Sequence, residues 1–329
     1  MSLVNATRYF ANALPFTAPN GQRVVVTLVK ATFERNRAGE FVLAAKPSPV
    51  RLGEELWDDN SPHGSVRYPS DLSCEKTGTD IVVVGSAISP KPVTRLDLMV
   101  RVGAHEAPLV VFGPRVFYKS PRGVAVGPPA RFEEVPVVYE HAYGGMAADF
   151  GCADERNPAG RGVAHKITDL IDTPAPQIEH PAFPHELATD DHPPAGYGAM
   201  RTHWLPRRSF AGTFDDTWRE TRMPLLPVDY NPLFENVAHP SLQLSESPPA
   251  GTPISILGMS TAGPFQCEIP DLKLVIHALR NGSKETVRPQ IDLILIEPER
   301  GRVELLARAV WTMGRGKTSL REVRVDTYL

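Results

Sequence analysis

The stretch RVVVTLVKATF, residues 23–33, decides the fold of this chain, because it is dominated by β-branched residues and lacks a helical period. Val29, Ala31 and Phe33 alternate along its second half and would share one face of an extended segment. We therefore expect a strand here. Comparable signals recur on both sides of a long central region, which predicts a domain built mostly of strands.

The alternation of Leu96, Leu98, Val100 and Val102 with polar residues and Met99 predicts a half-buried antiparallel strand. Residues 297–301 (EPERG) predict a hairpin turn between the last two strands of the set. The expected strands, each bounded by Gly, Pro or charged turns, are residues 23–33, 80–87, 95–102, 108–112, 254–257, 265–269, 272–279, 288–296 and 303–311.

Proline accounts for 33 of the 329 residues, about twice its usual share of roughly 5%, and this density excludes long helices. Residues 174–249 hold thirteen of these prolines together with many aromatic residues, which predicts a long but ordered loop region. One short helix is expected over residues 214–222, with Thr213 as its N-cap. The region has too few apolar periods for a sheet of its own.

These signals predict a mostly-β fold: a large, antiparallel, β-sandwich-like domain with a Pro-rich ordered loop region and one or two short helices. The whole chain, residues 1–329, is expected to form this single domain. A possible subdivision has an N-terminal β part, a loop-rich middle and a C-terminal β part, over residues 8–140, 141–250 and 251–329.

The formal net charge is −3, with 35 basic and 38 acidic residues, which argues against a nucleic-acid-binding protein. Cys74, Cys152 and Cys267 form no CxxC pair, so we expect a reducing compartment. The N-terminal residues do not resemble a signal peptide, and the longest apolar runs are too short to span a bilayer. We therefore expect a soluble, cytoplasmic protein without membrane insertion.

Motifs for nucleotide, metal and nucleophile chemistry are incomplete. The GRGKTS run, residues 314–319, lacks the earlier glycine of a phosphate-binding loop, because that position is Trp311. His180, His185 and His192 lack the i, i+4 spacing of a helical zinc site. Ser86 has Ile88 where a nucleophile elbow needs glycine. We therefore expect no enzyme activity, no catalytic residues, and no bound metal, cofactor or nucleotide.

The most distinctive stretch is VYEHAYGGMAADFGCADERNPAGRG, residues 138–162, which has neither helical nor alternating apolar spacing. Its glycines, Asn-Pro and tyrosines predict a tight, specific loop. We expect positive φ at Gly144 or Gly145, and Glu140 as acceptor for backbone N–H groups of that turn. If the segment is extended, Glu140 and His141 point to opposite faces.

The chemistry of this loop leaves an alternative open, namely an enzyme such as a hydrolase that uses Glu140, Asp149 or Asp154. A second motif, RYPSDL at residues 67–72, predicts a turn capped by Ser70 or Asp71 with Arg67 in a salt bridge. In the loop-rich middle, Trp and Arg recur four residues apart. Such residues suit either internal anchoring or partner binding, and the candidates are Tyr197, Trp204, Arg208 and Trp218.

The central loop resembles the signature of a bacterial family of unknown function that is encoded in type VI secretion clusters. Further stretches resemble the same family, among them LVKATF (28–33), RYPSDL (67–72), KTGTDIVVVG (76–85) and AGYG (195–198). The signature positions in this chain are Tyr139, Glu140, Ala142, Tyr143, Gly144, Gly145, Asn157, Pro158, Gly160, Arg161 and Gly162.

This resemblance implies an accessory protein of the type VI secretion machine. Such an adaptor or chaperone would bind a toxin effector or a PAAR-like protein and assist its loading on the spike protein VgrG. The resemblance supplies no catalytic residues. Together with the incomplete motifs, it leads us to expect a cytoplasmic adaptor that acts through protein–protein contacts.

Overall fold

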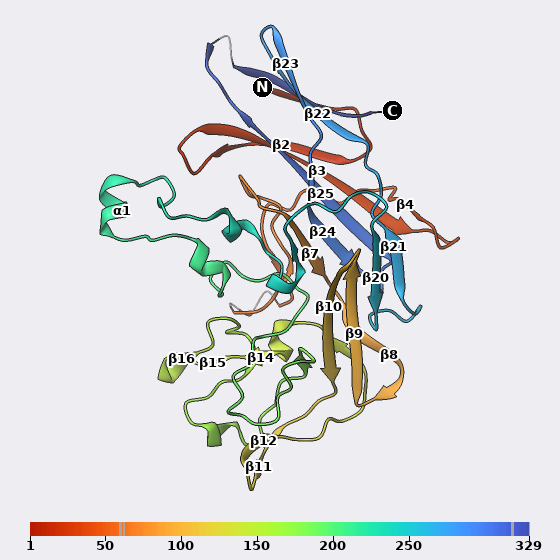
Figure 1. Ribbon diagram of the computed structural model, residues 1–329, viewed down its shortest axis with the longest axis vertical. Coiled ribbons are helices and arrows are strands. Elements are labelled where there is room, and N and C mark those ends of the chain that lie inside the picture. The colour runs from red at the N-terminus through yellow and green to blue at the C-terminus, as the bar shows by residue number, and fades with distance from the viewer. Residues whose placement is uncertain (59–60, 62, 317–318, 329) are drawn as a thin grey trace.

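Three sheets of the chain surround one hydrophobic core in the computed structural model, which describes residues 1–58, 61, 63–316 and 319–328. Figure 1 shows the sheet that carries both termini at the top, the longest strands below it, and a third sheet to the lower right. A loop carrying the helix α1 projects to the left, and a lobe of short strands lies at the bottom. The prediction of a mostly-β fold is confirmed.

The central sheet has seven strands and joins the N-terminal and C-terminal parts of the chain. Its order is β19-β7-β24-β25-β3-β2, and β4 pairs with β3 beside β2. All its pairings are antiparallel except β7 with β24, which is parallel. The strands are β2 (Phe10–Thr17), β3 (Arg23–Arg35), β4 (Phe41–Leu43), β7 (Thr79–Val83), β19 (Gln243–Leu244), β24 (Ile291–Glu297) and β25 (Arg302–Thr312).

Two further sheets complete the core. The five-stranded sheet has the order β18-β10-β9-β20-β21, and the four-stranded sheet has the order β1-β26-β22-β23, in which β1 runs parallel to β26. Their strands are β9 (Arg95–Val102), β10 (His105–Phe112), β18 (Ile178–Glu179), β20 (Pro253–Leu257), β21 (Phe265–Glu268), β1 (Ser2–Asn5), β22 (Leu274–Arg280), β23 (Ser283–Val287) and β26 (Leu320–Thr327).

Short two-stranded pairings and single turns make up the rest. Most lie in the lower lobe or connect it to the sheets (Figure 1). The pairs are β5 (Glu55–Leu56) with β6 (Val66–Tyr68), β8 (Ser86–Val93) with β13 (Phe132–Pro136), β11 (Phe117–Ser120) with β12 (Gly123–Val126), β14 (Tyr143–Gly144) with β17 (Arg161–Gly162), and β15 (Met146–Ala147) with β16 (Cys152–Ala153).

The helical elements are short, as the proline content predicts. Among the described residues, no helix is both long enough and apolar enough to cross a bilayer. The elements are α1 (Asp216–Thr221) and the 3₁₀ turns η1 (Tyr139–His141), η2 (Ala148–Phe150), η3 (Ile167–Leu170), η4 (Arg207–Phe210), η5 (Pro232–Glu235) and η6 (Pro240–Leu242).

Two sequence-based boundaries need correction. The strand expected over residues 80–87 is two strands, because the chain leaves the central sheet after Val83 and Ala87 pairs instead with Val135 of β13. The helix expected from residue 214 begins at Asp216, and its N-cap is Asp215, whose carboxylate accepts the Trp218 N–H at 2.7 Å. Thr213 is not the cap, since its hydroxyl donates to the Asp229 carboxylate.

Strand β3 is buried on both faces, with ten successive buried residues at 24–33. One of these is Lys30, whose side chain is fully enclosed in the centre of the sheet. Its ammonium lies 2.7 Å from Asp71 Oδ2 and 3.2 Å from Glu304 Oε2. Arg51 donates to Glu304 at 2.6 Å and Ser48 Oγ donates to its other oxygen at 2.7 Å. A buried charge is tolerated only with such partners.

The same contacts correct the expectation for the RYPSDL segment. Asp71 pairs with Lys30 and also accepts the Arg51 backbone N–H at 2.7 Å. Arg67 forms no ion pair with any described residue and lies instead over the rings of Trp57 and Tyr68, at 4.9 and 5.2 Å. The predicted turn is present, because Ser70 Oγ accepts the Leu72 N–H at 3.1 Å.

Replacing Lys30 tests how far the fold depends on this cluster. Lys30→Met leaves two buried carboxylates without their shared cation, so we expect unfolding free energy to fall by about 3–5 kcal/mol. Urea unfolding measures it. The matched control is Lys284→Met on the exposed strand β23, expected within about 0.5 kcal/mol of the parent. Equal effects of the two substitutions would contradict the assignment.

The pKa of Glu304 gives a second test. Burial alone would raise this pKa, but the hydrogen bond from Arg51 and the charges of Lys30 and Arg51 lower it to about 2. The carboxylate therefore stabilises the fold above its unfolded pKa, and this stability is lost as pH falls from about 4.5 towards 2.

The measurement compares the parent with Glu304→Gln at two pH values by urea unfolding. We expect the advantage of the parent to shrink by about 1.5 kcal/mol between pH 6.5 and pH 3.5. Taking the difference between the two proteins cancels the titration of the other carboxylates. An advantage that is the same at both pH values would show that Glu304 is not held ionised by its neighbours.

Candidate functional site

The motif loop, residues 139–162, begins with the 3₁₀ turn η1 and a buried tyrosine. Tyr139 is 1% exposed, and its ring meets Trp204 edge to face with centroids 5.3 Å apart. Its hydroxyl donates to Gly198 O at 3.2 Å, and its backbone N–H donates to Ser65 Oγ at 3.0 Å. Tyr139 thus anchors the loop beneath the surface.

Glu140 does not accept from the Gly144–Gly145 turn as expected. Its Oε1 accepts the Ser65 N–H at 2.6 Å, and its Oε2 accepts the Ser65 hydroxyl. Tyr139–His141 is a 3₁₀ turn and not an extended segment, and Glu140 reaches Ser65 in the segment before β6. His141 makes a different contact, from Nδ1 to Pro136 O at 3.1 Å.

Asn157 holds the glycine turn in place. Its side-chain amide donates to the carbonyls of Tyr139 and Tyr143, both at 2.8 Å, and its own carbonyl accepts the Gly145 N–H at 2.7 Å. The predicted positive φ is confirmed at both glycines, with 139° at Gly144 and 110° at Gly145. A Cβ at Gly144 would lie 2.2 Å from Asn157 O, so only glycine fits there.

The other half of the signature closes the loop. Pro158 lies in the turn that the Gly160 N–H closes on Asn157 O at 3.2 Å, and Gly162 has a φ of 119°. Arg161 pairs in parallel with Tyr143, and its guanidinium donates to Gln177 Oε1 at 3.0 Å. The signature residues therefore share one role in this structure, which is to build a rigid loop.

The three carboxylates considered for catalysis have different surroundings. Glu140 binds Ser65, and Asp154 forms a bidentate pair with Arg156 at 2.6 and 2.9 Å. Asp149 is exposed on η2. The contacts of the described residues thus give no acid–base pair among them.

A hollow of about 360 Å³ lies over Tyr143 in the lower lobe. Arg156 crosses it and also contacts Asp191 from the following loop. The lining residues are Tyr143, Ala153, Asp154, Glu155, Arg156, Val163, Asp191 and Leu205. Tyr143, one of these lining residues, also belongs to a stack of aromatic rings.

That stack connects the motif loop to the histidines of the next segment. The Tyr143 ring stacks on His185 with centroids 4.7 Å apart, and His185 contacts His192 at 4.9 Å. Burial lowers the pKa of His185 to about 4, and the charges of His192 and Arg115 act in the same direction. Ligand atoms of His185, Asp190 and His192 lie within 4.8 Å of one another. Sequence spacing gave no sign of this group, because loop residues need no helical period to meet.

Two of the four candidate partner-binding residues are internal, which corrects the expectation. Trp204 is fully buried against Tyr139, and Tyr197 is 1% exposed with its hydroxyl donating to Ala107 O at 2.7 Å. Arg208 is exposed and pairs with Glu155 at 2.8 Å. Trp218 is half-buried, and its indole N–H donates to Leu225 O at 2.8 Å. Neither Tyr197 nor Trp204 is available to a partner.

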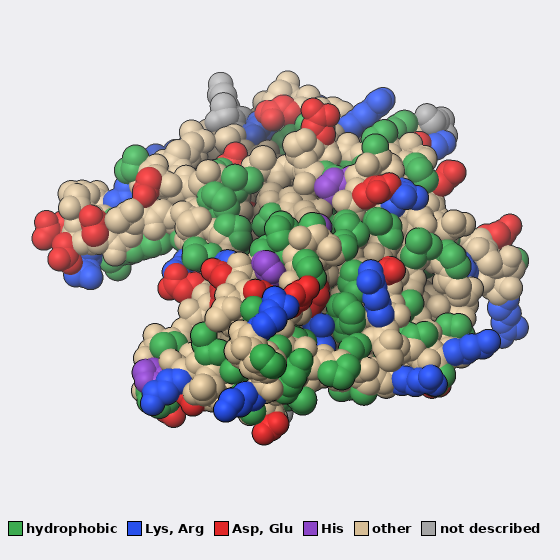
Figure 2. Space-filling model, turned by 60° about the horizontal axis from the view of Figure 1, so that its bottom comes forward, with side chains coloured by type: hydrophobic (Ala, Val, Ile, Leu, Met, Phe, Trp, Pro, Cys, Tyr) green, Lys and Arg blue, Asp and Glu red, His purple; other side chains and the backbone are tan. Residues whose placement is uncertain are grey.

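Trp218 belongs to the arm, residues 211–230, which projects from the sheets in Figure 1. Three apolar side chains of the arm are largely exposed, with 52% exposure at Phe214, 62% at Met223 and 84% at Val228. Figure 2 shows a notch between the arm and the lower lobe, with acidic and basic side chains gathered along it. The sequence does not single out these three residues, because exposure is not visible in composition.

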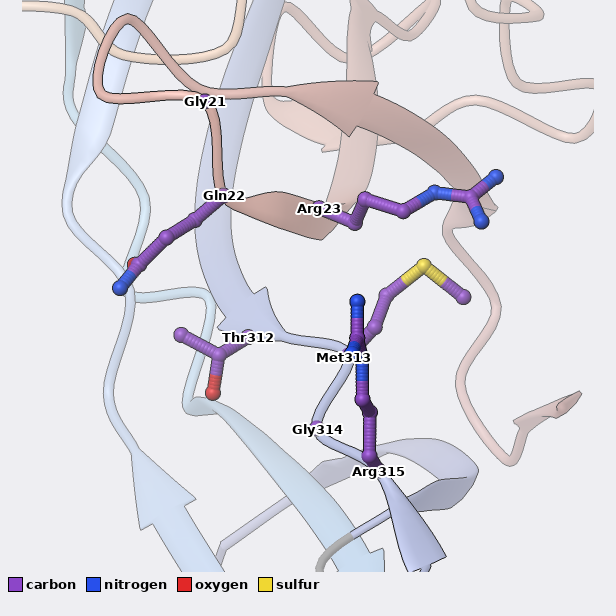
Figure 3. Close-up of a pocket in the computed structure, with 7 residues that line it drawn as sticks. All are labelled: Gly21, Gln22, Arg23, Thr312, Met313, Gly314 and Arg315. Atoms are coloured by element: carbon purple, nitrogen blue, oxygen red, sulfur yellow. The ribbon is translucent and has the colours of Figure 1, made fainter.

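A further hollow, of about 580 Å³, lies between the turn before β3 and the end of β25 (Figure 3). Gly314 and Arg315 of the GRGKTS run line it, while Lys317 and Thr318 lie outside the described residues. The run is followed by the strand β26 and not by the helix that a phosphate-binding loop requires.

One protein family matches most of the chain. Residues 20–308 match the family described as "uncharacterized protein conserved in bacteria (DUF2169)", and the chain belongs to this family. The matched region includes the motif loop, the arm, and Lys30 with Ser48, Arg51, Asp71 and Glu304. Comparisons with curated proteins and with solved structures gave no significant match.

The glycine turn yields a stability prediction. Gly144→Ala combines a positive φ with a clash against Asn157 O, so we expect unfolding free energy to fall by about 3 kcal/mol. The control is Gly123→Ala, where φ is 116° but no atom lies within 4 Å of the added Cβ, and about 1 kcal/mol is expected. Thermal or urea unfolding decides it, and equal losses would mean that packing against Asn157 is unimportant.

Proposed function

We propose that this chain is a type VI secretion accessory protein, a cytoplasmic adaptor or chaperone that binds a toxin effector or PAAR-like protein. It would assist the loading of that cargo on the VgrG spike. The sequence resemblance described above suggests the machine and the partners. The observation that carries the binding role is the arm, a preformed loop that presents exposed apolar side chains.

The arm is closed at its neck by hydrogen bonds. The Asn231 N–H donates to Phe210 O at 3.0 Å, and Thr213 donates to both carboxylate oxygens of Asp229 at 3.0 and 2.8 Å. Further along, Arg222 donates to Leu226 O and to Pro19 O, at 2.8 and 3.0 Å. These contacts fix the arm without covering its outer side.

A loop that is already ordered loses little conformational entropy when it binds. Immobilising a flexible side chain at an interface costs about 0.5–1.5 kcal/mol of binding free energy. A preformed loop avoids part of this cost. Phe214, Met223 and Val228 remain largely in water in the free chain. Burying them against a partner would therefore stabilise the complex, as clusters of exposed apolar side chains at binding sites do.

The short helix adds charge to this surface. Asp215, Asp216 and Glu220 are exposed on or beside α1, and among them only Asp216 pairs with a described cation, Arg219, at 2.6 Å. The acidic tip is visible at the end of the arm in Figure 2. We infer that the partner carries an apolar patch bordered by basic residues, because complementary charge guides association.

The test is a triple variant of the arm, Phe214→Ser, Met223→Ser and Val228→Ser. The tagged chain is co-expressed with the effector, PAAR-like and VgrG proteins of the same bacterium, and the co-purified partner is titrated. We expect the triple variant to bind at least about 30-fold more weakly, because the loss of a single hot-spot residue already costs about 2 kcal/mol. Its melting temperature should stay near that of the parent.

A matched control removes three apolar side chains of moderate exposure from the sheets, namely Val287, Val310 and Leu257. Their replacement by Ser should leave partner binding unchanged. If the arm variant retains its partner, or if both triple variants lose it equally, the arm is not the binding surface. If none of the three classes of protein co-purifies with the parent, the adaptor role itself is refuted.

A further inference from the structure

The loop that follows the motif loop gathers two imidazoles and one carboxylate at a single point. One ligand atom from each of His185, Asp190 and His192 lies within 4.8 Å of the other two. His185 is buried, while Asp190 and His192 are half-buried, so the group is reachable from solvent. The i, i+4 spacing, whose absence argued against a metal site in the sequence, is a criterion for helices. It does not apply to residues that one folded loop brings together.

Hydrogen bonds orient two of these side chains and leave each of them one further atom that can bind a metal. Asp190 Oδ2 accepts the backbone N–H groups of Glu186 and Leu187 at 2.9 and 2.8 Å, and Oδ1 accepts from no described residue. His192 Nε2 lies 3.1 Å from Pro184 O. A carbonyl only accepts, so Nε2 carries the proton and Nδ1 keeps its lone pair.

This arrangement matches the outer contacts of metal-binding histidines. Such histidines usually donate one ring N–H to a carbonyl or carboxylate, which fixes the ring and leaves the other nitrogen for the metal. His185 completes the set: neither of its ring nitrogens makes a hydrogen bond with a described residue. Its ring is held instead between the Tyr143 ring and His192.

The neighbouring guanidinium groups are compensated. Arg115 pairs with Glu179, and Arg156 pairs with Asp154 and Asp191. Asp190 adds a carboxylate within the group itself. A bound cation would therefore lie beside a carboxylate, with both of these guanidinium groups already paired.

We propose that His185, Asp190 and His192 bind a divalent transition-metal ion of the zinc class. Two nitrogens and one carboxylate oxygen suit Zn²⁺ and related ions and not Mg²⁺ or Ca²⁺, which prefer oxygen ligands. Bonds of about 2.0–2.1 Å would place the ligand atoms about 3.4 Å apart, so the three side chains would move closer together on binding. The ion would brace the loop against Tyr143 and so against the motif loop, with a fourth position left for water.

The experiment measures zinc binding by the full chain alone. Protein treated with EDTA is dialysed against micromolar Zn²⁺, and bound metal is determined by elemental analysis, with Co²⁺ absorption as a spectroscopic readout. We expect about one equivalent in the parent. His185→Ala, His192→Ala and Asp190→Asn should each weaken binding at least tenfold. His180→Ala, in the same segment but outside the group, should bind like the parent.

Melting curves in EDTA establish that each variant is folded. Asp190→Asn keeps an oxygen that can accept the two backbone N–H groups, so it supplies the test if a histidine variant unfolds. Zinc should raise the melting temperature of the parent and of His180→Ala but not of the three ligand variants. Failure of the parent to retain zinc, or retention by all ligand variants, would overturn the proposal. Neither result bears on cargo binding by the arm.

Discussion

The buried ammonium of Lys30 constrains more of this structure than any other single group. A charge enclosed in the middle of a sheet must be compensated, and the compensation comes from two directions. Glu304 stands on the neighbouring strand β25, whereas Asp71 belongs to the chain that crosses over the sheet before β7. The ion cluster therefore fixes where that crossing segment lies, in addition to joining two strands.

The segment that contains Asp71 also positions the motif loop. Ser65 lies six residues before Asp71. Its N–H and its hydroxyl donate to the Glu140 carboxylate, and its hydroxyl oxygen accepts the Tyr139 N–H. Asn157 then ties both ends of the motif loop together, and Tyr143 carries the contact on to His185. The sheets, the signature residues and the histidine group are thus connected by hydrogen bonds and, at Tyr143, by ring stacking.

Sequence reasoning predicted the elements whose causes are local. The alternation at residues 95–102 reappears as strand β9 between β10 and β20, and EPERG is the hairpin turn between β24 and β25. The positive φ at Gly144 and Gly145 followed from residue type alone.

The burial of Lys30 could not be predicted, because a lysine next to Val29 in an alternating strand ordinarily faces water. The two carboxylates that pair with it are 41 and 274 residues away in the chain. The roles of Tyr197 and Trp204 were ambiguous, because the sequence alone does not tell whether an aromatic residue is buried in the core or exposed to a partner. His185 and His192 were considered and set aside on their spacing, and Asp190 was not considered, because their meeting depends on a loop conformation that no period encodes.

The closed neck of the arm has a consequence for how this chain can be engineered. The Asn231 N–H donates to Phe210 O, so the intervening residues form a cassette that begins and ends at one point of the fold. Every strand of the three sheets lies outside this cassette, and so do Lys30, Asp71 and Glu304. The cassette can therefore be shortened or replaced as a unit without removing a strand or a member of the buried ion cluster.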